Sequence, residues 1–93
     1  MIEREGDQLR VRGALTVGNA TEVCEEGKQH LTGNLVVDLA GVTEADSSAL
    51  SVLFEWRRAA QQKKLSISFS NLPESMKSLA ALYGVTELVV PGA

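Results

Sequence analysis

The segment from position 65 to 70 alternates strictly between apolar and serine side chains. Its six residues are Leu65, Ser66, Ile67, Ser68, Phe69 and Ser70. Because successive side chains of a β-strand point to opposite faces of the sheet, this pattern predicts a strand with one apolar and one polar face. The strands of a doubly wound nucleotide-binding sheet are covered on both faces, so the serine stripe argues against that fold. We therefore expect a sheet whose helices lie mainly on one face.

The other periodic segments place this strand in a chain where strands and helices alternate. Strands are expected at 8–12, where Gly13 ends the strand, at 15–17, at 35–39, bounded by Gly41, and at 85–90. Helices are expected from Asn19 to about Leu31, with Glu22 in capping-box position, at 49–60, and from Pro73 to Gly84, with Met76, Leu79, Ala80 and Tyr83 on one face. Right-handed crossovers keep consecutive helices on one face of a sheet. The prediction is an α/β fold with a mixed sheet, built as a single domain over residues 1–93.

Charge and hydropathy exclude several classes of partner. The chain has 9 basic and 12 acidic residues and a formal charge of −3, without a basic run that could follow a phosphate backbone, so we expect no nucleic-acid partner. No apolar run approaches the ~18 to 20 residues that span a bilayer, so direct membrane insertion is not expected. The charged N-terminal segment lacks the apolar stretch of a secretory signal. These features predict a cytoplasmic protein.

The residues that usually carry chemistry are too few for a catalytic or metal site. Cys24 is the single cysteine and His30 the single histidine, so neither a thiolate cluster nor a histidine pair can form. No glycine-rich loop with a lysine follows a predicted strand, which argues against a phosphate cradle. We interpret Cys24 as a buried helical residue. The expectation is a protein that is not an enzyme and has no catalytic residue, no metal and no cofactor.

The motif Asp46-Ser47-Ser48-Ala49-Leu50 stands where a loop enters the second predicted helix. Aspartate and serine are preferred at helix N-termini, where a side-chain oxygen accepts a hydrogen bond from a free backbone N–H group. The same position tolerates a phosphate, so a hydroxyl there is also a candidate charge switch. The sequence leaves both interpretations open.

The helix that follows the motif has two apolar faces. At ~100° per residue, one face should pack against the sheet; it comprises Ala49, Val52, Leu53, Trp56 and Ala60. Leu50 and Phe54 fall well away from that face, beside Arg57 and Gln61. This second stripe is either covered by neighbouring loops or exposed as an interface next to the serine motif.

The motif, the preceding segment 35–39 with Val42, and the order of elements resemble the STAS domain, the family of anti-sigma factor antagonists. The resemblance implies that a partner kinase would phosphorylate Ser48, the second serine of the motif. The usual glycine after it is replaced by Ala49, which is a better helix former. Under this interpretation the partner would be an anti-sigma factor kinase.

Segments 55–60, 72–76 and 79–85 resemble one branch of the family more closely, the MlaB-like STAS subunits of phospholipid-transporting ABC complexes. The resemblance implies binding to the cytoplasmic ATPase of such a complex, peripheral to the inner membrane, in support of outer-membrane lipid asymmetry. Ser47 occupies the position where threonine is common in that branch. A weak homodimer, and a small-ligand module if a pocket opens beside the motif, remain further alternatives. The expected partner-binding residues are Ser47, Ser48, Leu50, Phe54 and Arg57.

Overall fold

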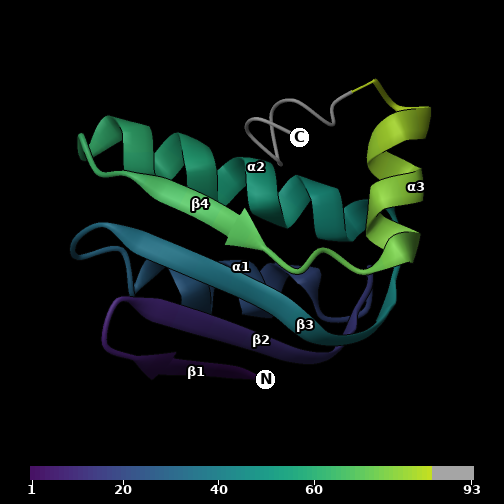
Figure 1. Ribbon diagram of the computed structural model, residues 1–93, viewed down its shortest axis with the longest axis horizontal. Coiled ribbons are helices and arrows are strands. Elements are labelled where there is room, and N and C mark those ends of the chain that lie inside the picture. The colour runs from purple at the N-terminus through teal and green to yellow at the C-terminus, as the bar shows by residue number, and fades with distance from the viewer. Residues whose placement is uncertain (85–93) are drawn as a thin grey trace.

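The computed structural model describes residues 1–84, which form one layer of strands and one layer of helices (Figure 1). In chain order the elements are β1 (Ile2–Glu5), β2 (Gln8–Leu15), α1 (Ala20–Lys28), β3 (Leu35–Ala45), α2 (Ser47–Gln62), β4 (Ile67–Ser70) and α3 (Glu74–Leu82). The strand expected at 85–90 lies outside the described residues.

The described strands form one mixed sheet in the order β1-β2-β3-β4. β1 and β2 are an antiparallel hairpin, whereas β2 with β3 and β3 with β4 are parallel pairs. α1 connects the first parallel pair and α2 the second, and the two helices pack against each other on the same side of the sheet (Figure 1). This arrangement confirms the predicted α/β fold with helices mainly on one face.

The serine stripe lies as the alternation predicts. Phe69 is buried beneath the helices, whereas Ser66 is exposed and Ser70 is half-buried. The strand is shorter than expected and begins at Ile67, because Leu65 still belongs to the turn that ends α2. Its backbone N–H donates to Ala60 O at 2.8 Å, and this turn follows a positive φ of 58° at Lys64.

Two glycines that were predicted to end strands lie inside strands. β2 continues through Gly13, which has a φ of +84°, and the register with β3 shifts between Gly13 and Ala14. β3 continues through Gly41 to Ala45, and a Cβ at Gly41 would lie 2.9 Å from Arg12 Cγ. Glycine therefore permits a bulge and a close strand approach here, and it does not terminate pairing.

Several further predictions in the N-terminal half differ from the structure. Residues 15–17 do not form a separate strand, because Leu15 ends β2 and the next residues turn into α1; the short strand β1 was missed among charged residues. Asn19 does not cap α1 with its side chain. Its Oδ1 accepts from Thr16 N–H at 3.0 Å, and its Nδ2 donates to Ala14 O at 2.8 Å. The amide thus holds the β2–α1 loop together, and the helix ends at Lys28 rather than at Leu31.

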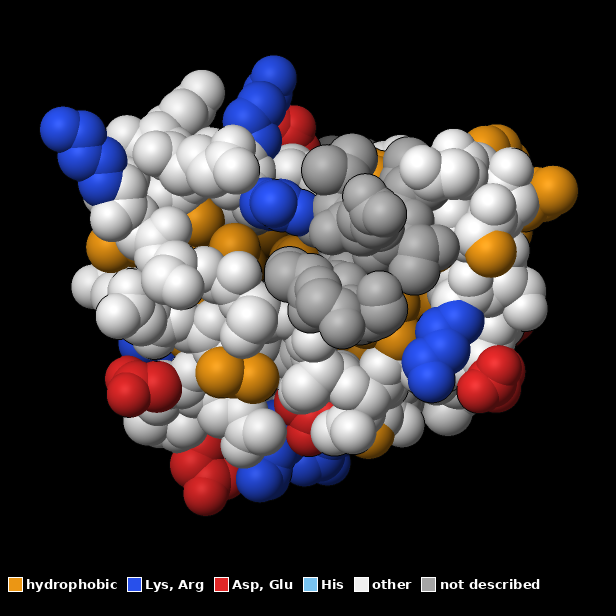
Figure 2. All heavy atoms as spheres, turned by 45° about the horizontal axis from the view of Figure 1, so that its top comes forward, with side chains coloured by type: hydrophobic (Ala, Val, Ile, Leu, Met, Phe, Trp, Pro, Cys, Tyr) orange, Lys and Arg blue, Asp and Glu red, His pale blue; other side chains and the backbone are white. Residues whose placement is uncertain are grey.

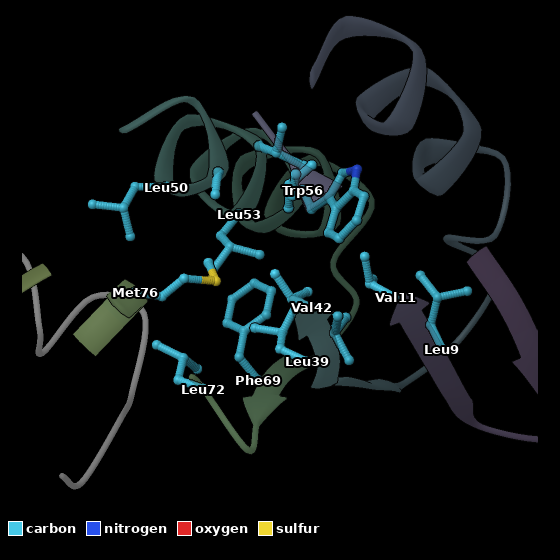
Figure 3. Close-up of a cluster of buried hydrophobic side chains, with 14 of the residues drawn as sticks. Leu9, Val11, Leu39, Val42, Leu50, Leu53, Trp56, Phe69, Leu72 and Met76 are labelled. Atoms are coloured by element: carbon cyan, nitrogen blue, oxygen red, sulfur yellow. The ribbon is translucent and has the colours of Figure 1, made fainter. Parts of the chain in front are cut away.

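The core lies between the sheet and the helices, with α2 at its centre (Figure 3). All five residues predicted to face the sheet from α2 are buried: Ala49, Val52, Leu53, Trp56 and Ala60. Trp56 is 1% exposed and points towards α1, where its Nε1–H donates to Cys24 O at 2.9 Å. Met76 and Ala80 bury one face of α3 as expected, but Tyr83 is 58% exposed and not in the core.

Candidate functional site

Asp46 organises the start of α2. Its backbone is extended (φ −124°, ψ −169°), and its Oδ1 accepts a hydrogen bond from Ser48 N–H at 2.8 Å. This is an N-cap, in which a side-chain carboxylate satisfies one of the backbone donors that a helix leaves free in its first turn. The capping interpretation of the motif is therefore confirmed for Asp46.

The other oxygen of the same carboxylate joins α2 to the loop before α1. Asp46 Oδ2 accepts from Val17 N–H at 3.0 Å. The hydrogen bond from Val17, and then those from Ser48, lower the pKa of Asp46 because they stabilise its ionised form. Val17 itself is 79% exposed. One ionised side chain thus holds an exposed apolar residue beside the serine motif.

The two serines of the motif face different surfaces. Ser47 is exposed and lines a groove between α2 and α3, whereas Ser48 is half-exposed and lines a groove between α1 and α2. Consecutive helical residues point ~100° apart, which is enough to separate the two hydroxyls. Ser51, one turn further on, borders both grooves.

The α1–α2 groove has a volume of about 470 Å³. Its described lining includes four apolar or weakly polar residues, which are Val17, Ala20, Cys24 and Val52. Three residues carry hydroxyl groups (Thr21, Ser48 and Ser51), and four are charged (Glu25, Lys28, Glu55 and Arg58). The charges pair within their own helices, since Lys28 Nζ lies 3.9 Å from Glu25 and Arg58 contacts Glu55. A pocket therefore does open beside the motif, and its rim has balanced charge.

The α2–α3 groove is smaller, about 290 Å³, and less polar. Its described lining is Ser47, Leu50, Ser51, Phe54 and Tyr83. Three of the five residues predicted to bind a partner meet here, together with Tyr83, which was predicted to share one helix face with Met76 and Ala80. No pattern in the sequence singled out Tyr83 as a surface residue, because its spacing from Met76 and Ala80 is that of a buried helical face.

The predicted apolar stripe on α2 is only partly exposed. Leu50 is 3% exposed and belongs to the core, so the alternative in which neighbouring segments cover the stripe holds for this residue. Helix α3 packs against α2, and Leu50 and Met76 lie on the same side of the core (Figure 3). Phe54 is half-buried against the core. Arg57 is half-buried and lines neither groove, and its Nη1 is shielded from solvent without a hydrogen bond to any residue in 1–84.

The chemistry within reach of the motif is hydrogen bonding and apolar contact. Cys24, in the wall of the α1–α2 groove, has a thiol pKa raised by burial, which makes the thiol a weak nucleophile. Over residues 1–84, no three side chains among histidine, cysteine, aspartate and glutamate are grouped as a metal site would need. None of the helices in this part of the chain has the length and hydrophobicity needed to cross a bilayer.

The surface around α2 is mixed in character. Figure 2 shows hydrophobic side chains emerging as separate patches between polar ones on the face that carries α2, with most charged side chains towards the rim. Beside the motif, the most exposed large apolar residues are Val17 and Tyr83, one on each side of the α2 N-terminus. The motif thus combines hydroxyls with flanking apolar side chains, a composition that suits contact with another protein.

Comparison with known proteins gives one family and a consistent set of folds. The family model described as "Mlab, STAS domain" matches residues 1–91. No curated protein matches the sequence. Among solved structures, the MlaB chain in the Acinetobacter MlaFEDB complex, in its ATP-bound conformation, shares 26% identity with a TM-score of 0.81. That match covers 96% of this chain and 97% of the other.

Other solved structures share the fold at lower identity. The unphosphorylated anti-sigma factor antagonist SpoIIAA has 12% identity and a TM-score of 0.64, covering 84% of this chain and 78% of its own. A Thermotoga maritima protein assigned as an anti-sigma factor antagonist has 14% identity and a TM-score of 0.77, covering 97% and 82%. A match to Mglu covers 77% of this chain but only 19% of that much longer one, with 23% identity and a TM-score of 0.60.

Proposed function

This chain belongs to the STAS domain family, and from that premise we propose that it is a non-catalytic subunit of a phospholipid-transporting ABC complex. In this role it binds the ATPase of the complex through the start of α2 and regulates or stabilises it. The chain would then sit at the cytoplasmic side of the inner membrane, held there by its complex.

The observation that carries this proposal is the match to the MlaB chain, which spans nearly the whole of both chains. A module whose described fold matches that chain over nearly its full length is suited to the same place in an assembly. The matches to antagonists are at 12% and 14% identity and support the fold alone.

The geometry of the motif suits a permanent contact. Asp46 pins the first turn of α2 through two hydrogen bonds, so Ser47 is presented on a rigid element and not on a free loop. The hydroxyl of Ser47 is exposed at the α2–α3 groove, where Phe54 and Tyr83 add apolar surface. A partner can therefore place one hydrogen-bonding group and one apolar side chain against the same short surface.

The surroundings of Ser48 are less suited to a phosphate switch. Its backbone N–H is already taken by the Asp46 carboxylate, and Glu25 and Glu55 line the same groove as its hydroxyl. A phosphate there would add about −1.5 to −2 charges. Lys28 and Arg58 line the groove as well, but each is already paired with one of these glutamates, so the described lining offers no free cation to hold a phosphate. We therefore propose an unmodified Ser48 at the edge of the contact.

The proposal is tested by mixing the purified chain with the ATPase subunit of an Mla-type complex from the same genome. We expect a stable complex and a changed rate of ATP hydrolysis. Ser47→Asp should weaken binding more than Ser47→Ala, because it places an unpaired charge in a desolvated contact. Ser66→Asp is the matched control, since Ser66 is exposed on the strand side at the other end of α2.

Three results would count against the proposal. Failure of the unmodified chain to bind the ATPase would refute it directly. Equal binding by Ser47→Asp and Ser66→Asp would indicate that the ATPase contacts a surface other than the motif. A stoichiometric phosphate on Ser48, detected by intact mass of the protein from its native cells, would favour the switch instead.

A further inference from the structure

Gly27 and Trp56 make an unusually close contact between α1 and α2. A Cβ built on Gly27 would overlap the Cε2 and Cζ2 atoms of the Trp56 indole and lie 2.6 Å from its Nε1. Real Cβ atoms do not approach other atoms so closely, so no other amino acid fits at position 27 while the indole stays where it is. Glycine is otherwise a poor choice inside a helix, because alanine is the better helix former.

The same indole also holds α1 by a hydrogen bond. Trp56 Nε1–H donates to Cys24 O at 2.9 Å, and within residues 1–84 this is the only side-chain hydrogen bond that joins α1 to α2. The indole is 1% exposed, so the bond is shielded from water. Figure 3 shows the ring pointing from α2 towards α1. One side chain therefore sets both how near α1 comes and where along α2 it is held.

This contact lies directly behind the α1–α2 groove. Cys24 and Lys28, on either side of Gly27 in α1, line the groove on one wall, and Val52 and Glu55 line it on the other. The groove wall is thus built from the same helical turns that the indole holds together. A change in the Gly27–Trp56 contact must therefore change the width of the groove.

We propose that Gly27 and Trp56 are a matched pair of positioning residues that sets the width of the α1–α2 groove, and thereby the size of the apolar side chain that a partner can insert there. The small side chains of Ala20 and Cys24 leave room for such an insertion, and the internally paired charges at the rim favour a neutral one. Only the identity of the partner rests on the proposed function. The width itself can be measured on the isolated chain.

The single cysteine makes the groove width measurable. Cys24 lines the groove, so its alkylation by a small reagent, iodoacetamide, and by a bulky one, pyrenyl maleimide, reports how wide the opening is. Trp56 is the single tryptophan, so fluorescence emission reports whether its indole stays buried. Gly27→Ala is the test substitution. Gly33→Ala is its matched control, because nothing lies within 4 Å of a Cβ at Gly33.

In folded Gly27→Ala, we expect the emission to shift to longer wavelength and the ratio of bulky to small alkylation rates to rise. Binding of the Mla-type ATPase should weaken by about tenfold, because Gly27 acts on the partner at a distance, through the width of the groove. Gly33→Ala should behave like the unmodified chain. Adding Trp56→Leu to Gly27→Ala makes room for the new methyl group, so the alkylation ratio and the affinity should return towards their original values.

An unchanged emission and alkylation ratio in folded Gly27→Ala would overturn the proposal, as would a double variant that rescues neither. If Gly27→Ala does not fold, the double variant decides: recovery of folding supports the matched pair, and continued failure refutes it. If the unmodified chain does not bind the ATPase, the proposed function is refuted. The alkylation ratio still tests whether Gly27 and Trp56 set the width of the groove.

Discussion

The two grooves beside α2 start from adjacent serines but are built differently. The α1–α2 groove, with Ser48, is about 470 Å³ and is backed by the Trp56 indole and its hydrogen bond to α1. The α2–α3 groove, with Ser47, is about 290 Å³, has no charged residue in its described lining and is bordered by the exposed Tyr83. The difference shows that one motif can serve two surfaces, because a single step along a helix turns the side chain by ~100°.

The walls of the two grooves also differ in how firmly they are held. α1 lies along α2 and is fixed by close packing at Gly27, whereas α3 covers the start of α2 with Met76 and Ala80 and leaves Leu82 and Tyr83 exposed. We therefore expect substitutions behind the α1–α2 groove to lower stability and to affect binding only through the width of that groove. Substitutions at the α2–α3 groove should act more on binding.

The largest effect is expected for Trp56→Ala. Removing a fully buried aromatic side chain costs about 3 to 5 kcal/mol of unfolding free energy, a large part of the stability of a small domain. Tyr83→Ala, on the other side of α2, should change stability by only about 0.5 kcal/mol, as is usual for an exposed site. Urea unfolding of both variants measures the contrast. Equal losses would show that the two grooves are equally well supported.

Leu50→Ala and Phe54→Ala separate core from surface within the α2–α3 groove itself. Leu50 is buried, so its truncation should cost about 2 to 4 kcal/mol, while half-buried Phe54 should cost about 1 to 2 kcal/mol. Phe54→Ala should in addition weaken binding of the ATPase. A Phe54 variant that loses more stability than the Leu50 variant would contradict this assignment.

Alanine substitutions of Ser47 and Ser48 compare the contributions of the two grooves to binding, and they disturb the structure little. If the partner's main contact is at the α2–α3 groove, Ser47→Ala should weaken binding by about 0.5 to 1.5 kcal/mol, the net value of one hydrogen bond, and Ser48→Ala by less. Isothermal titration with the ATPase measures both. The reverse order would assign the main contact to the α1–α2 groove.

The smallest effect is expected on folding stability at acidic pH. Because its hydrogen bonds lower the pKa of Asp46 in the folded chain below the usual value near 3.8, Asp46 stabilises the fold above that pH. This contribution is lost as the pH falls through the lowered pKa. Asp46→Asn keeps a capping oxygen but removes the charge, so its stability should fall less steeply below about pH 4. Urea unfolding at pH 6 and pH 3 tests this, and parallel curves for the two proteins would contradict it.

Periodicity alone determined the elements that carry a repeated pattern. The serine stripe predicted a sheet covered mainly on one face, and the spacing of apolar residues in α2 identified five of the six that are buried in the core. Asp46 was recognisable as a cap because its hydrogen bond is local, made to Ser48 only two residues away. Each of these features depends on neighbours in the chain, which a sequence shows directly.

Contacts between distant segments were decided by the tertiary structure. Gly13 and Gly41 read as strand ends, but the pairing of β2 with β3 carries the strands through them. Leu50 became a core residue because α3, some 25 positions further on, folds over it, and Tyr83 was left exposed at the end of the same helix. The residues around Gly27 in the sequence do not indicate that Trp56 packs against it. The fit of a glycine to an indole on another helix depends on distances across the fold, and those exist only once the chain has packed.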